Sequence, residues 1–197
     1  MWRNSKSIFE SHIMPKLTLK NIAASALLIS AGGTFHAANA HVTLEYQVAN
    51  AASSYKATFR VGHGCGASPT REIAVTIPAG VEGAKPMPKA GWTIAIEREK
   101  LAQPRTDHGK TITDEVRRIR WTAKTPADAL PGNFYDEFTL QARMPAQAGT
   151  IYWPVEQICE QGSMHWNQVP AAGQKLHDLK SPAAALELMP AAGGHSH

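Results

Sequence analysis

A histidine that follows a motif of small residues is the first place in this chain where chemistry can be expected. Ala38, Asn39 and Ala40 fit the pattern at which a signal peptidase cuts, and His41 comes next. After that cut, the α-amine and Nδ1 of His41 would form one short chelate ring, which suits two adjacent corners of a tetragonal Cu(II) site. Both groups can lose their protons near neutral pH, as metal binding requires. The alternative interpretation is that His41 merely begins a β-strand.

The segment before His41 is predicted to be a removable signal peptide. Lys16 and Lys20 precede an apolar run at residues 22–31, which is too short to stay in a bilayer as an anchor. We therefore expect residues 1–40 to direct export, with cleavage between Ala40 and His41. The mature protein is expected to be periplasmic or otherwise exported, without a permanent membrane anchor.

The charge balance argues against nucleic acid as a partner. The chain has 20 Lys and Arg residues, 16 Asp and Glu residues and a net charge of +4 over 197 residues. Four of the basic residues and one acidic residue lie in the first 40 positions, so the remaining 157 residues carry a net charge of about +1. A nearly neutral mature chain gives no electrostatic basis for binding nucleic acid. Its length suits a single domain with a buried core.

Polar and apolar residues alternate in short segments that are separated by turn-forming residues, which is typical of β-strands. The predicted strands cover residues 55–61, 71–77, 92–96, 116–122, 134–142 and 151–155. A polar hairpin arm is expected between Glu97 and Asp114. Since no helical period of useful length is present, the sequence predicts an all-β, antiparallel β-sandwich.

We expect this domain to span residues 41–180 and to be followed by a flexible tail at 181–197. Within that tail, residues 182–190 could add a strand or a short helix at an edge. His195 and His197 end the chain as a His-x-His motif that can bind metal weakly.

Cys65 and Cys159 are the two cysteines of the chain, and they are 94 residues apart. An even pair in an exported protein predicts one disulfide. The alternative is that the two thiolates bind copper or carry out redox chemistry. No Cys-x-x-Cys spacing supports that alternative, so the disulfide is favoured.

Other metal-capable side chains lie near predicted turns, and each has an ordinary structural alternative. His63 could pack in the corner beside Cys65, Asp136 could cap a turn, and His165 could be an exposed strand residue. The sequence has no Gly-x-Ser-x-Gly, no His-Glu-x-x-His and no phosphate-binding glycine loop. We therefore assign no catalytic residue and do not expect an enzyme.

Several segments taken in order resemble the YcnI-like copper-binding domain of exported bacterial proteins. They are Ala40-His41-Val42-Thr43-Leu44, Tyr55-Lys56-Ala57, His63-Gly64-Cys65, Ile77-Pro78-Ala79-Gly80-Val81, Lys85-Pro86-Met87-Pro88-Lys89, Gly91-Trp92, Tyr135-Asp136-Glu137-Phe138 and Gln157-Ile158-Cys159-Glu160-Gln161-Gly162, followed by Trp166. The resemblance implies a cupredoxin-like or immunoglobulin-like β-sandwich that binds Cu(II) through the amine and imidazole of His41, a monohistidine brace. It also implies an assisting carboxylate and a nearby tryptophan, Trp166, and His63 is expected near the metal.

The resemblance leaves Asp136 and Glu137 open as the assisting carboxylate. Strand parity places Asp136 on the apolar face and Glu137 on the polar face. Glu137 is therefore slightly favoured as the ligand, and Asp136 is given an orienting or structural role. Arg71 or Arg117 is the expected ion-pair partner of a buried carboxylate here.

Three functions follow from these observations. The leading hypothesis is a periplasmic Cu(II)-binding protein that sequesters copper or delivers it to other copper-handling proteins, without turnover. The second is a histidine-brace copper monooxygenase, in which His63 or His165 would supply a further nitrogen. The third is a metal-free exported domain used for protein interaction.

Overall fold

The computed structural model describes residues 41–107 and 109–191. The predicted signal peptide, its cleavage site, His108 and the terminal pair His195 and His197 lie outside the described residues. Within the described ranges the regular secondary structure consists of β-strands and two short 3₁₀ turns. No described segment forms a helix long and apolar enough to cross a membrane.

The strands follow one another closely along the chain. Their bounds are β1 (Thr43–Leu44), β2 (Val48–Asn50), β3 (Ser54–Val61), β4 (Thr70–Thr76), β5 (Glu82–Pro86), β6 (Trp92–Asp107), β7 (Lys110–Ala123), β8 (Asp136–Arg143), β9 (Gly149–Trp153), β10 (Val155–Cys159), β11 (Ser163–Trp166) and β12 (Ala184–Met189). The two 3₁₀ turns are η2 (Pro126–Asp128) and η3 (Leu176–Asp178).

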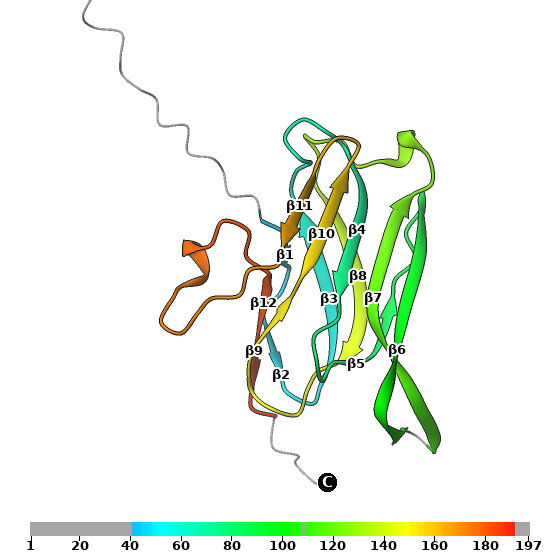
Figure 1. Cartoon of the computed structure of the whole chain (residues 1–197), viewed down its shortest axis with the longest axis vertical. Coiled ribbons are helices and arrows are strands. Elements are labelled where there is room, and N and C mark those ends of the chain that lie inside the picture. The colour runs from blue at the N-terminus through cyan, green and yellow to red at the C-terminus, as the bar shows by residue number, and fades with distance from the viewer. Residues whose placement is uncertain (1–40, 108, 192–197) are drawn as a thin grey trace, which may run out of the picture. The chain divides into compact units, whose positions relative to one another are not determined.

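The strands form three sheets, shown in Figure 1, and the core lies between them. One sheet has the order β1-β3-β8-β5, the second β11-β10-β4-β7-β6, and the third β2-β12-β9. Pairing is antiparallel except between β2 and β12, which run parallel. The predicted all-β sandwich is thus confirmed for this part of the chain.

Alternation along β3 shows how the sequence builds this core. Tyr55, Ala57, Phe59 and Val61 are all buried, as their common parity predicts. Phe138 of β8 then contacts two tryptophans of the opposite sheet edge to face, at ring-centroid distances of 5.0 Å and 5.9 Å. Each such aromatic side chain contributes about 1.5–3 kcal/mol by leaving water, so these contacts hold the sheets together.

The C-terminal segment differs from the predicted flexible tail. Residues 184–189 form β12, which pairs with β9 on one side and with β2 on the other. Ala184, Leu186 and Leu188 are buried, because their two-residue period matches the pleat and fills the core. The domain therefore continues past residue 180, and the alternative of an added strand is the correct one.

Three local predictions also need correction. The predicted strand 151–155 is divided at Pro154 into β9 and β10, which belong to different sheets. The predicted strand 134–142 begins only at Asp136, as β8, so Phe134 lies before it and is 59% exposed. The predicted strand 92–96 does not end at Ile96: β6 continues past the core into the long β6–β7 hairpin, drawn in green in Figure 1, and Ile96 is 47% exposed.

Candidate metal centre

His41 lies at the start of the folded domain, directly before β1. Val42, the next residue, is buried at 2% exposure, so the chain is held against the core from its first residues. The imidazole of His41 packs against the indole of Trp166, with ring centroids 5.5 Å apart and an interplanar angle of 63°. Strand β11 positions Trp166, which is 2% exposed. The contact between this histidine and this tryptophan is the starting point of the candidate site.

Neither nitrogen of the His41 imidazole is committed to a hydrogen bond within the described part of the chain. Nε2 is buried and has no hydrogen-bond partner there. A neutral imidazole carries its proton on one nitrogen and offers a lone pair on the other, and a hydrogen bond usually decides which. Since no described group makes that choice for His41, no hydrogen bond within the described residues ties up Nδ1.

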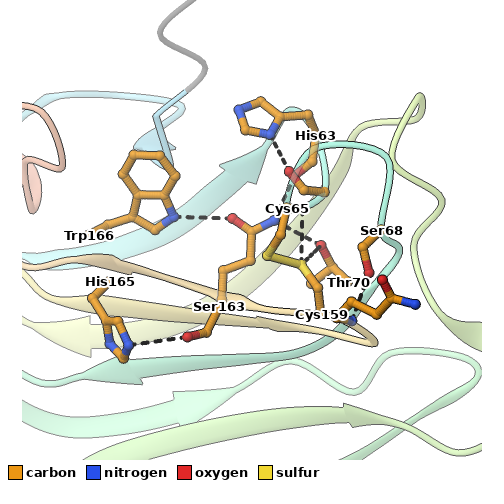
Figure 2. Close-up of a disulfide and its surroundings, with 11 residues drawn as sticks. His63, Cys65, Ser68, Thr70, Cys159, Ser163, His165 and Trp166 are labelled. Carbon is orange, nitrogen blue, oxygen red and sulfur yellow. Dashed lines mark hydrogen bonds between the residues drawn. A yellow bond between two sulfur atoms is a disulfide. The ribbon is translucent and has the colours of Figure 1, made fainter.

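The indole N–H of Trp166 is occupied by a buried glutamine. Trp166 Nε1 donates to Gln157 Oε1 at 3.1 Å, as Figure 2 shows. The amide nitrogen of Gln157 donates in turn to the carbonyl of His63 at 2.6 Å and to Thr70 Oγ1 at 2.8 Å. Gln157 is only 1% exposed, so these bonds fix both its amide and the tryptophan ring.

The predicted disulfide is confirmed. Cys65 and Cys159 are bonded, with their Cα atoms 6.0 Å apart, and the described residues contain no free cysteine. The bond joins the corner after β3 to the end of β10, and the Cys65 N–H donates to Cys159 Sγ at 3.0 Å. In Figure 2 this bridge lies beside Thr70, whose hydroxyl accepts one of the Gln157 hydrogen bonds. Both sulfur atoms therefore belong to the disulfide and do not provide thiolate ligands for a metal.

His63 and His165 have local contacts of their own. The Nδ1 atom of His63 contacts the carbonyl oxygen of Gly64, its neighbour in the chain. His165 is 55% exposed, lies 4.0 Å from Glu156 and is 3.4 Å from Ser163 Oγ. Within the described residues, no ring contact or hydrogen bond joins either imidazole to His41.

Each of the two predicted carboxylates is paired with a cation. Asp136 Oδ1 lies 2.7 Å from Lys89 Nζ, so the expected partner, Arg71 or Arg117, is wrong. Lys89 was overlooked because it lies in a proline-rich segment outside the strands, from which it reaches across to β8. The same ammonium donates to the Glu137 carbonyl at 3.1 Å.

Glu137 has the looser of the two pairings. Its carboxylate is 3.7 Å from Arg60 Nε, and both side chains are substantially exposed, at 37% and 50%. Arg60 is opposite Glu137 in β8 and opposite Thr43 in β1, so these three residues share one row and one face of the sheet. Glu137 therefore lies on the outer face, as its parity predicts.

No three His, Cys, Asp or Glu side chains converge in the described ranges to form a metal cluster. Of the predicted site residues, His41 and Trp166 are the two whose rings the structure brings into contact.

A cavity of about 250 Å³ opens beside His41. Its walls are mostly apolar, and it contains a second histidine, His177, which the sequence did not single out. His177 belongs to η3, inside an irregular segment between β11 and β12. No periodicity or motif marks it, and only the fold brings it to the cavity that His41 also lines.

The fold places this protein among the immunoglobulin-like β-sandwiches. It is similar to a solved structure described as "Crystal structure of an uncharacterized protein from Nocardia farcinica reveals an immunoglobulin-like fold". The two share 27% sequence identity over 75% of this chain and 97% of the other, with a TM-score of 0.59. No curated protein matches the chain. A family model described as "Domain of unknown function (DUF1775)" matches residues 41–188, and the chain belongs to that family.

Proposed function

We propose that this protein is an exported Cu(II)-binding protein of the YcnI-like type that sequesters copper or passes it to other copper-handling proteins. The α-amine and Nδ1 of His41 hold the metal once the first 40 residues are removed. Copper is the cargo of this site and undergoes no turnover there. The observation that carries the proposal is the packing of His41 against Trp166.

Two further observations support His41 as the metal-binding residue. Its imidazole makes no hydrogen bond with described residues, and its Nε2 atom is buried, so the ring is positioned by packing alone. The family match also begins at residue 41, where the predicted cleavage would place the new N-terminus. Nδ1 and the amine of a first residue can close a chelate ring without moving any other part of the fold.

Trp166 would limit access to the metal and keep the imidazole in place. Its N–H is already bonded to Gln157, so the indole presents carbon atoms to His41 and competes for no ligand position. A ring that is 2% exposed also excludes water from one side of the site. Exclusion of water strengthens the electrostatic attraction between a cation and its donors.

Glu137 is the carboxylate that we propose as an additional oxygen ligand. Release of Glu137 from Arg60 costs little, because exposed ion pairs at such distances contribute about 0–1 kcal/mol. Asp136 is held more closely, since Lys89 Nζ is 2.7 Å away and the lysine side chain is only 19% exposed. Asp136 is therefore expected to keep its structural ion pair while Glu137 is free to turn.

The proposal is tested by titrating Cu(II) into protein that begins at His41 and into protein with one additional residue before it. The additional residue converts the amine into an amide and removes one half of the chelate. We expect one tight Cu(II) per chain in the first protein and a large loss of affinity in the second. Equal affinity would contradict the brace, and oxidation of polysaccharide by the reduced copper form would contradict a purely binding role.

A further inference from the structure

We propose that His177 supplies a further imidazole nitrogen to the Cu(II) held by His41. This inference rests on the proposed function and adds a ligand to the same site. Four features of the structure carry it: the anchoring of the loop, the pairing of His177 with Asp178, the shared cavity and the exposure of the imidazole.

The loop that carries His177 is fixed at its base beside the candidate site. It spans residues 167–183, leaving Trp166 at the end of β11 and returning into β12. Gln168 N donates to the Ser181 carbonyl at 3.0 Å, and Ala183 N donates to the Gln168 carbonyl at 2.9 Å. Ser181 N also donates to Gln168 Oε1 at 2.8 Å. Figure 1 shows this segment, in orange, standing next to β11 and β12.

Inside the loop, Asp178 occupies one nitrogen of His177 and leaves the other available. Asp178 Oδ1 lies 3.4 Å from His177 Nε2, within ion-pair range. The second oxygen of Asp178 accepts a hydrogen bond from Lys175 N at 3.1 Å, which orients the carboxylate. Metal-binding histidines commonly have a carboxylate on the ring nitrogen that does not bind the metal. In this arrangement Nδ1 of His177 is the nitrogen left for a metal.

His41 and His177 line the same cavity of about 250 Å³. The other walls are mostly apolar and include Leu44, Leu176 and the Pro182–Ala185 segment, and Thr43 and Gln47 add two neutral oxygen-bearing side chains. The volume exceeds the roughly 30 Å³ that one water occupies, so it can hold an ion with a water molecule. The two imidazoles are thus the side chains of this cavity that are suited to Cu(II).

The His177 side chain is 76% exposed, so it can turn toward the cavity without breaking any packing. Its contact with Asp178 is exposed too and contributes little to folding. Substitution of His177 should therefore leave the free energy of unfolding nearly unchanged. That separation between binding and folding makes His177 suitable for a mutational test.

The experiment compares His177→Ala with His165→Ala in protein that begins at His41. His165 is the matched control, because it is an exposed histidine one residue before Trp166 and is not among the residues that line the cavity. Cu(II) affinity is measured by competitive titration, and pulsed electron paramagnetic resonance counts the imidazoles bound to the metal. Thermal unfolding of the metal-free variants confirms that both are folded.

We expect two imidazoles in the wild type and in His165→Ala, and one in His177→Ala. The affinity of His177→Ala should fall about tenfold or more, since even outer-shell partners of metal ligands are worth about 10–100-fold. Tight binding with one imidazole in the wild type, or an unchanged imidazole count in His177→Ala, would overturn the role of His177 and leave the His41 brace standing. A wild type that takes up no Cu(II) would overturn the proposed function as well.

Discussion

The two sides of Trp166 differ in how their polar groups are used. On one side, Gln157 satisfies the indole N–H, the His63 carbonyl and the Thr70 hydroxyl with its single amide. On the other side, the imidazole of His41 packs on the indole and makes no hydrogen bond with described residues. Trp166 thus lies between a satisfied hydrogen-bond network and the imidazole of His41, whose two nitrogens make no hydrogen bond with described residues.

This difference teaches which polar groups have structural roles and which are available to a ligand. Buried polar atoms are almost always hydrogen-bonded, because an unpaired one costs about 1–3 kcal/mol. The Gln157 side follows this rule, so changes there should affect stability. The His41 side departs from it, so changes there should affect metal binding and leave folding nearly intact.

The largest expected effect is the loss of the disulfide, which lies on the Gln157 side of Trp166. Replacing both Cys65 and Cys159 by serine should lower the free energy of unfolding by about 2–5 kcal/mol, because the bond constrains a long loop of the unfolded chain. Urea unfolding of the exported wild type and the double variant measures this loss. Two free thiols in the exported wild type, detected by mass spectrometry, would contradict the prediction.

A smaller loss of stability is expected for Gln157→Leu. The substitution leaves buried partners of Gln157 unsatisfied, which should cost about 1–3 kcal/mol and shift the fluorescence of Trp166. The control is Gln141→Leu, because the Gln141 side chain is exposed and, among the described residues, is shown bonded only to Ser54 Oγ. Its effect should stay within about 0.5 kcal/mol. Equal losses of unfolding free energy in the two variants would show that the Gln157 network stabilises the fold no more than an exposed glutamine does.

Tyr55, near the start of β3, carries another buried polar group, a phenol hydroxyl. Burial, with Glu45 nearby, raises the pKa of Tyr55 to about 12. Its contribution to stability is therefore fully present below about pH 10, the ordinary tyrosine pKa, and is lost as the pH rises through the folded value. The loss should reach roughly 2 kcal/mol, and Tyr55→Phe should remove this pH dependence. The free energy of unfolding, measured between pH 9 and 12, tests this prediction. Tyr152→Phe is the control, because this variant should keep the pH dependence of the wild type.

The two carboxylates should show the smallest effect and should differ from each other. Glu137→Gln is expected to weaken Cu(II) binding about tenfold, or about 1.4 kcal/mol, because a hard oxygen ligand is lost. Asp136→Asn should leave copper affinity nearly unchanged, since Asp136 stays paired with Lys89. Both are isosteric amides, so each serves as the other's control. Weaker copper binding in Asp136→Asn alone would reverse the assignment.

The fold could be predicted from the sequence because its signals are local. Alternation over residues 55–61 and 71–77 reports the two faces of a strand directly, and the strands formed as expected. The disulfide could also be predicted, since two cysteines in a chain that is expected to be exported have few other uses. The part of the predicted tail at 184–189 was misjudged because Ala184, Leu186 and Leu188 show a weak alternation that becomes decisive only beside β2 and β9.

The candidate site was less predictable because it depends on contacts between distant segments. Position after Ala40 suggested His41, and the family resemblance suggested Trp166, and the structure places their rings in contact. Gln157 and His177 were not recognised in the same way: Gln157 lies in a segment of the resemblance that gave it no role, and His177 lies outside every such segment. Lys89 was missed as the partner of Asp136 because the ion pair joins residues 47 apart in the chain.

The central claim is tested most directly by a crystal structure of the processed protein, beginning at His41, grown with one equivalent of Cu(II). The account predicts copper bonded to the α-amine and Nδ1 of His41, beside the indole of Trp166. Copper bound at other histidines, with the His41 amine and imidazole free of metal, would contradict it.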